Sequence, residues 1–66
     1  MDYALMIKKL REKLILSQTE LADLLDVSYI TVNRWENGVF EPTIKAKRKL
    51  MALFRENNIV EDVKWD

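Results

Sequence analysis

Apolar residues recur along most of the chain at the three- and four-residue spacing of a helix that buries one side. In the first such stretch, about Tyr3 to Leu14, an apolar stripe is formed by Ile7, Leu10 and Leu14, with charged residues between them. Three later stretches show the same periodicity: about Gln18 to Leu25, Tyr29 to Asn37 and Ile44 to Glu56. Side chains at this spacing share one helix face, so the pattern predicts four amphipathic helices. The other positions expected to face inward are Leu21, Ala22, Leu25, Val32, Trp35, Ala46, Leu50, Leu53 and Phe54.

Short polar residues stand where these helices would begin. Asp2, Ser28 and Thr43 each precede a helical stretch, where a side-chain oxygen can accept a hydrogen bond from a free backbone N–H. Ser17 and Glu20 have the spacing of a capping box, in which each side chain bonds the other residue's backbone N–H. The starts of all four helices are therefore predicted from local sequence.

The second and third helices are predicted to cross closely, because only a tight turn separates them. Asp26 lies where the chain needs a positive φ, which Asp tolerates better than most residues. Ala22 keeps the second helix thin at the crossing, and Val32 fills the space between the two helices. This spacing predicts a helix-turn-helix, a unit that presents its second helix to the major groove of DNA.

The expected fold is all-α, a compact bundle of four to five short helices, and it occupies residues 1–56. Residues 57–66 form an acidic, apolar tail in which Ile59, Val63 and Trp65 fit either a short strand or a helical turn. We expect this tail either to pack on the domain or to lie at a dimer interface.

Composition excludes several classes of protein. The chain has 66 residues and contains no cysteine and no histidine, which rules out a disulfide scaffold, a zinc finger and a Ser-His-Asp or thiol enzyme built from this chain. We expect no catalytic residues, no metal and no cofactor.

No apolar run approaches the roughly 20 residues that a membrane span needs, and no basic-then-apolar secretion signal begins the chain. We therefore expect a cytoplasmic protein that does not bind membranes.

The net charge of zero hides an uneven distribution. Residues 1–55 contain ten Lys or Arg and seven Asp or Glu, a net charge of +3, whereas residues 56–66 contain one Lys and four acids, a net charge of −3. A mildly basic body attracts phosphate only modestly. High affinity for DNA would therefore need two copies of the chain or closely fitted contacts.

Many positions between about Ile7 and Phe54 match one family in order. The matching positions are Ile7, Leu10, Arg11, Leu16, Ser17, Gln18, Leu21, Ala22, Val27, Ser28, Thr31, Val32, Trp35, Glu36, Asn37, Gly38, Pro42 and Thr43. On these residues the chain resembles the Cro/C1-type helix-turn-helix domains of phage repressors and their bacterial relatives, also called the XRE family. The resemblance implies a lambda-repressor-like fold. Ile15 and Asp26 depart from the family, which often has Gly or Asn at the first position and Gly at the second.

The resemblance also implies roles for particular side chains. Gln18 and Asn37 correspond to residues that hold DNA phosphates, and Ser28 is expected to do the same. Lys45 belongs to a basic segment that can reach phosphate. Arg11 and Glu36 correspond to a structural ion pair. The residues expected to face the bases are Tyr29, Ile30, Thr31, Asn33 and Arg34.

Chemistry matches the base-facing residues to particular bases. Arg34 can bond guanine O6 and N7 with both arms of its guanidinium, and Asn33 can pair with adenine N6 and N7. Ile30 or the methyl group of Thr31 can contact a thymine methyl. Tyr29 fits two positions equally well, either packed on the second helix or reaching a phosphate.

The sequence therefore predicts a sequence-specific binder of double-stranded DNA, a repressor-like transcriptional regulator that acts as a homodimer. The alternative is an antitoxin or accessory regulator whose main partner is another protein, such as a toxin. The apolar residues of the tail motivate this alternative. A domain that keeps the fold without binding DNA is disfavoured, since it would not need the polar residues Gln18, Asn33 and Arg34 on one surface.

Overall fold

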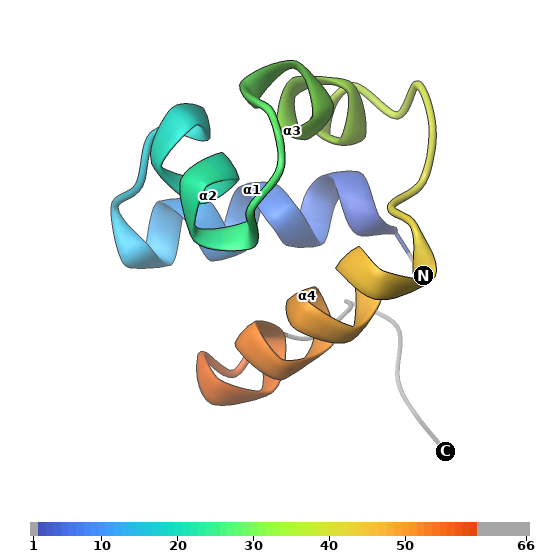
Figure 1. Cartoon of the computed structure of the whole chain (residues 1–66). Helices are drawn as coiled ribbons and strands as arrows, with labels where there is room; N and C mark the ends of the chain where they lie inside the picture. The colour runs from blue at the N-terminus through green and yellow to red at the C-terminus, as the bar shows by residue number, and fades with distance from the viewer. Residues whose placement is uncertain (1, 60–66) are drawn as a thin grey trace.

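The computed structural model describes residues 2–59, and these residues form four helices and no strand. The helices are α1 (Tyr3–Leu14), α2 (Gln18–Leu25), α3 (Tyr29–Glu36) and α4 (Ile44–Glu56). In Figure 1, α1 runs through the middle of the molecule, α2 and α3 lie on one side of it, and α4 crosses the other side. The predicted all-α bundle is confirmed. The third helix ends one residue earlier than expected, at Glu36.

The predicted caps are present at all four helix starts. The side chains of Asp2, Ser17, Ser28 and Thr43 each accept a hydrogen bond from the backbone N–H three residues later. Ser17 and Glu20 complete the capping box, because the Glu20 carboxylate accepts from the Ser17 N–H at 2.9 Å. These bonds satisfy N–H groups that a helix start otherwise leaves without a partner.

All four helices also end in the same way. Just after each helix one residue takes a positive φ, and the next residue donates its N–H back to the carbonyl five positions earlier, which is the Schellman motif. The residues with positive φ are Ile15, Asp26, Gly38 and Asn58. Of the apolar residues that follow them, Leu16, Val27 and Ile59 pack against the core, whereas Val39 is exposed.

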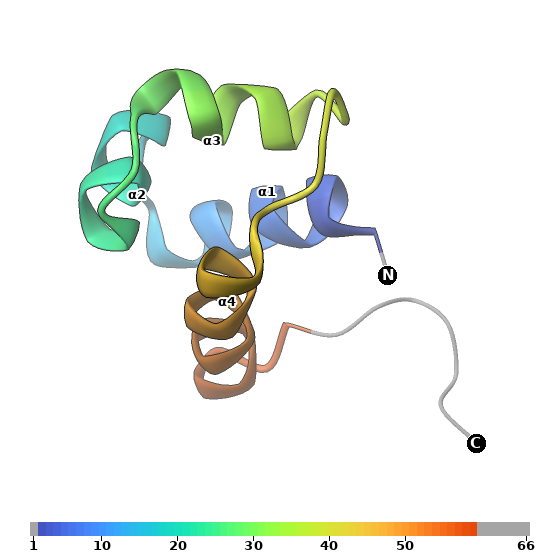
Figure 2. The same cartoon turned by 45° about the vertical axis from the view of Figure 1, so that its right-hand side comes forward.

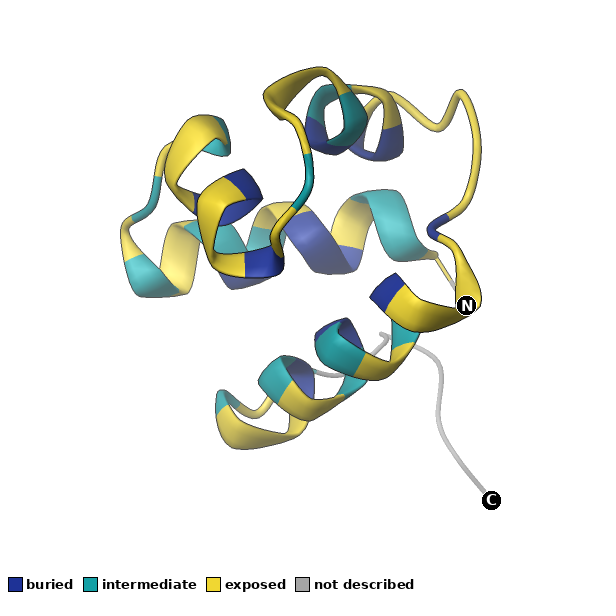
Figure 3. Ribbon diagram, viewed as in Figure 1, coloured by how far each residue is buried: buried dark blue, intermediate teal, exposed yellow. Residues whose placement is uncertain are grey.

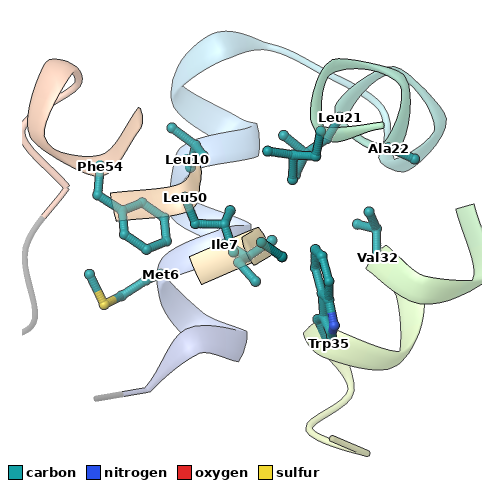
Figure 4. Packing of buried hydrophobic residues seen from close by; sticks show 11 residues of the cluster. Met6, Ile7, Leu10, Leu21, Ala22, Val32, Trp35, Leu50 and Phe54 are labelled. Atoms are coloured by element: carbon teal, nitrogen blue, oxygen red, sulfur yellow. The ribbon is translucent and has the colours of Figure 1, made fainter. Parts of the chain in front are cut away.

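The core gathers on the sides of the helices that face one another. Ile7 and Leu10 of α1, Leu21 of α2, Val32 of α3 and Leu50 of α4 have no exposed surface, and Figure 4 shows these side chains converging between the helices. Figure 3 shows the same arrangement as dark blue segments turned inward on every helix. The apolar stripes predicted from the sequence are thus the stripes that are buried.

Two predicted core positions were wrong in part. Leu14 and Leu53 are only half-buried, because each lies on the flank of its stripe and packs against the edge of the core. Met6 was not predicted, yet it is 3% exposed and points from α1 toward Phe54 of α4. Its unbranched side chain fills the space that α4 leaves beside Ile7. Of the tail, Ile59 packs against the core, and the expectations for Val63 and Trp65 fall on residues that the structure does not describe.

Ile15 adopts a conformation that costs free energy. Its φ of 56° and ψ of 51° lie in the left-handed region, which β-branched residues rarely occupy, and its side chain is 88% exposed. We expect Ile15→Gly to raise the free energy of unfolding by about 1 kcal/mol, because relief of strain outweighs the added freedom of the unfolded chain. Urea denaturation followed by circular dichroism measures the change.

Ile44→Gly is the matched control for this change. Ile44 is also exposed, but it is the first residue of α4, where glycine brings only the entropic cost. The control should therefore lose stability. A variant Ile15→Gly that also loses stability would mean that the strain at this position is negligible.

Candidate nucleic-acid interface

Helix α3 has one face buried in the domain and one face open. Val32 and Trp35 are buried, whereas Tyr29, Ile30 and Arg34 are exposed, and the exposed residues lie on the opposite side of the helix by its 3.6-residue period. Figure 2 shows α3 lying across the top of the molecule, with α1 beneath it. Three of the five residues predicted to face bases are therefore open to a partner.

The close crossing of α2 and α3 holds this helix in place. Ala22 is 2% exposed and Val32 is fully buried, as the predicted helix-turn-helix requires. Asp26 makes the turn with a φ of 58° and a ψ of 46°. Because Ala22 of α2 and Val32 of α3 are both buried, α3 is supported along its inner face while its outer face stays free.

A continuous chain of side-chain hydrogen bonds runs from α1 to the end of α3. We call it the polar network, and its members are Arg11, Glu36, Gln18, Asn33 and Asn37. Arg11 donates to Glu36 through Nε at 2.8 Å and through Nη2 at 3.1 Å. Gln18 Nε2 donates to Glu36 Oε1 at 3.1 Å, Asn33 Nδ2 donates to Gln18 Oε1 at 3.2 Å, and Asn37 Nδ2 donates to Asn33 Oδ1 at 3.1 Å. The network joins α1, α2 and α3 around the buried carboxylate of Glu36.

The predicted contact residues take different places in this arrangement. Gln18 and Asn33 are half-buried and bonded to each other, which leaves one N–H on each amide for a partner outside the chain. Asn37 is exposed at the end of α3. Sequence reasoning assigned each of these residues to DNA separately and missed that they form one unit. The contacts of an amide side chain depend on where the helices cross, and no local pattern reports that.

The start of α3 carries a second polar group. The hydroxyl groups of Ser28 and Thr31 lie 2.8 Å apart, and Ser28 Oγ accepts from the Thr31 N–H at 3.1 Å. Thr31 is half-buried and completes this cap, so its methyl group lies at the margin of the exposed face. Lys45 is exposed beside the turn between α2 and α3, where it lines a shallow hollow with Asp26 and Val27.

One residue near the exposed face was missed by the sequence analysis. The ring of Phe40, in the loop after α3, lies 5.9 Å from the guanidinium carbon of Arg34. Its only signal in the sequence is Gly38, whose positive φ turns the chain back toward the last turn of α3.

The environment of Glu36 favours its ionised form. Burial alone would raise the pKa of this carboxyl. Hydrogen bonds from Arg11 and Gln18 and the positive charges of Arg11 and Lys8 have a larger, opposite effect, so the pKa stays below its ordinary value of 4.5. The carboxylate in turn raises the pKa of Arg11 through the hydrogen bond between them. Both groups of the ion pair therefore stay charged at neutral pH.

This lowered pKa predicts how stability changes with pH. A carboxyl whose pKa is lower in the folded than in the unfolded chain stabilises the fold above its unfolded pKa, and the contribution is lost as the pH falls through the folded pKa. We expect the free energy of unfolding to decline below about pH 4.5. Glu20, whose pKa its hydrogen bonds to Ser17 lower, acts in the same direction. Urea denaturation between pH 3 and pH 7 would measure the slope.

The variant Glu36→Gln tests the assignment of this slope. It should be less stable than the natural chain at pH 7 but change less between pH 5 and pH 3. Glu56→Gln removes an exposed carboxylate at the end of α4 and is the matched control. Equal slopes in Glu36→Gln and in the natural chain would show that Glu36 does not carry the acid sensitivity.

The described residues contain no helix long and apolar enough to cross a membrane, and they contain no cluster of acidic residues that could hold a metal ion.

Comparison with known proteins identifies one relationship. A family model described as helix-turn-helix matches residues 7–56, which cover all of α2, α3 and α4 and most of α1. Searches of the curated proteins and of the solved structures find no significant match.

Proposed function

Because the chain belongs to the Cro/C1-type helix-turn-helix family of DNA-binding regulators, we propose that it recognises a specific DNA sequence by placing α3 in the major groove. We also propose that it acts as a repressor-like dimer in the cytoplasm. The open face of α3, with Tyr29, Ile30 and Arg34 exposed on a supported helix, is the observation that carries this proposal. The major groove of B-DNA admits a single α-helix, and α3 lies along one side of the domain with no other helix over its outer face.

The assignments of individual residues follow from their positions. Arg34 is the guanine reader, and the remaining base contacts are assigned to Tyr29, Ile30, Thr31 and Asn33. Phosphate contacts are assigned to Gln18, Ser28, Asn37 and Lys45. Gln18 and Ser28 lie at the starts of α2 and α3, where free backbone N–H groups also favour an anion. Asn37 lies at the end of α3 and would contact phosphate through its side-chain amide.

The size and charge of the chain support the proposed dimer. A domain with this few residues covers little DNA, and a net charge of zero provides little attraction to phosphate. Two copies would read half-sites about 34 Å apart, one turn of the double helix, and would combine two weak contacts into one tight one.

Selection of bound duplexes from a random pool tests the function directly. We expect the full chain to enrich one motif as an inverted repeat, with half-sites spaced by about 10 base pairs. Enrichment of a single half-site would contradict the dimer and leave sequence-specific binding standing. A pool that remains random after several rounds would overturn the proposed function.

The alternative function is binding to a protein partner, as an antitoxin or accessory regulator does. Apolar side chains that the described domain leaves exposed favour it, in particular Leu24, Val39 and Ile44.

Sedimentation of the full chain and of a chain ending at Ile59 tests whether the tail is responsible for self-association. Ile59 is kept because its N–H caps α4 and its side chain packs on the core. A dimer that becomes a monomer on truncation assigns the tail to self-association, whereas an unchanged monomer excludes it.

A further inference from the structure

The loop after α3 is folded back over the last turn of that helix. Gly38, with a φ of 70°, allows the N–H of Val39 to bond the carbonyl of Arg34 at 3.0 Å and its own N–H to bond the carbonyl of Trp35 at 3.1 Å. These two bonds reverse the chain within one turn of the helix. Residue 40 is thereby brought back beside residue 34, although six positions separate them.

Phe40 has no evident role in holding the domain together. Its side chain is 45% exposed, and it is not among the apolar residues that pack against the core. The group that its ring meets is the guanidinium of Arg34, 5.9 Å from the ring centre. An exposed aromatic ring in a surface loop is normally a cost to solubility, so this contact needs a reason other than folding.

Arg34 has no competing partner among residues 2–59. Its guanidinium forms no ion pair or hydrogen bond there. A cation–π contact uses the flat face of the guanidinium and leaves the N–H groups on its edge free. Those edge groups are the ones that bond guanine O6 and N7.

We propose that Phe40 is a positioning residue, which holds the guanidinium of Arg34 in the orientation that reads a base. The proposal rests on the proposed function of α3. A free arginine side chain loses much rotamer freedom when it binds a base edge. The ring of Phe40 restricts that freedom before DNA arrives, so less is lost on binding and discrimination between base pairs improves.

The experiment measures affinity by fluorescence anisotropy for two duplexes. One carries the sequence selected by the natural chain, and the other carries a substitution at the base pair whose discrimination Arg34→Ala abolishes. We expect Phe40→Ala to lower the ratio of the two affinities about two- to fivefold, the effect of an exposed cation–π contact. Phe40→Leu should lose the same discrimination because it keeps bulk without a ring face, and Phe40→Tyr should retain it.

The double variant Arg34→Ala, Phe40→Ala separates positioning from direct contact. If Phe40 acts through Arg34, adding Phe40→Ala to Arg34→Ala should not change the ratio further. An equal loss in both backgrounds would mean that Phe40 touches DNA itself and would overturn the proposal, as would an unchanged ratio in Phe40→Ala. Unfolding midpoints of all variants should match their parents, since Phe40 lies outside the core.

The outcomes also distinguish this proposal from the function on which it rests. If the natural chain enriches no motif, both fall together. If it enriches a motif that Arg34→Ala fails to read, while Phe40→Ala reads it as well as the natural chain, only the role of Phe40 falls.

Discussion

Replacing Arg11 by methionine is expected to lower the free energy of unfolding by about 3 kcal/mol. The change keeps most of the apolar stem of the side chain but leaves the carboxylate of Glu36, which is 4% exposed, without its cation. It also removes the hydrogen bond from Arg11 Nη1 to the carbonyl of Leu16, in the connection between α1 and α2. For a domain with a total stability of roughly 5 kcal/mol, this is a large fraction. Urea denaturation at pH 7 measures it.

Two further variants show whether the buried charge is the cause. Arg55→Met makes the same change at an exposed position in the last turn of α4 and should have little effect. Adding Glu36→Met to Arg11→Met removes the stranded charge, so the double variant should be more stable than Arg11→Met alone. A loss in Arg11→Met no larger than in Arg55→Met would mean that the pair contributes no more than an ion pair on the surface.

The fold was predictable because its determinants are local. A cap such as Ser17 with Glu20 specifies the start of a helix within four residues, and the apolar period specifies which face is buried. The turn at Asp26 followed from the spacing between Ala22 and Val32. Where the prediction failed, at Met6 and Leu14, the outcome depends on how deeply a neighbouring helix packs. Periodicity ranks positions around a helix but does not report that depth.

The site was predictable only in part, for a related reason. Helical spacing was enough to identify Arg34 and Ile30 as outward-facing. The pairing of Arg11 with Glu36, 25 residues later, came from the family resemblance and not from any pattern in the chain. The bonds among Gln18, Asn33 and Asn37 escaped both approaches. They depend on amide groups that become neighbours only after α2 and α3 have crossed.

The polar network connects the exposed face of α3 to the residues that stabilise the domain. Gln18 bonds both the carboxylate of the ion pair and Asn33 on α3, so a change at Gln18 affects the support of the helix as well as any phosphate contact. Gln18→Ala would therefore weaken binding to all sequences for two reasons at once. Arg34 lies outside the network, and within residues 2–59 its guanidinium makes no hydrogen bond or ion pair and lies beside the ring of Phe40. Recognition can therefore be changed at Arg34 with little effect on folding.

Replacing Arg34 by alanine is accordingly expected to cost about 1–3 kcal/mol of discrimination at one base pair in each half-site. The loss should appear as a preference abolished at that position, because a bidentate guanidinium selects guanine and alanine selects nothing. The unfolding midpoint should change little, since Arg34 is exposed. Competition binding with duplexes substituted at every position of the selected motif measures the preference.

Arg55→Ala is the matched control for the change at Arg34. It removes the same charge from the last turn of α4, away from the exposed face of α3. It should weaken binding to all sequences slightly and equally, through charge alone. The contrast between the two variants separates base reading from general attraction to phosphate. If Arg34→Ala weakened every duplex by the same factor, Arg34 would be a phosphate contact, and the base-reading role assigned to the end of α3 would be wrong.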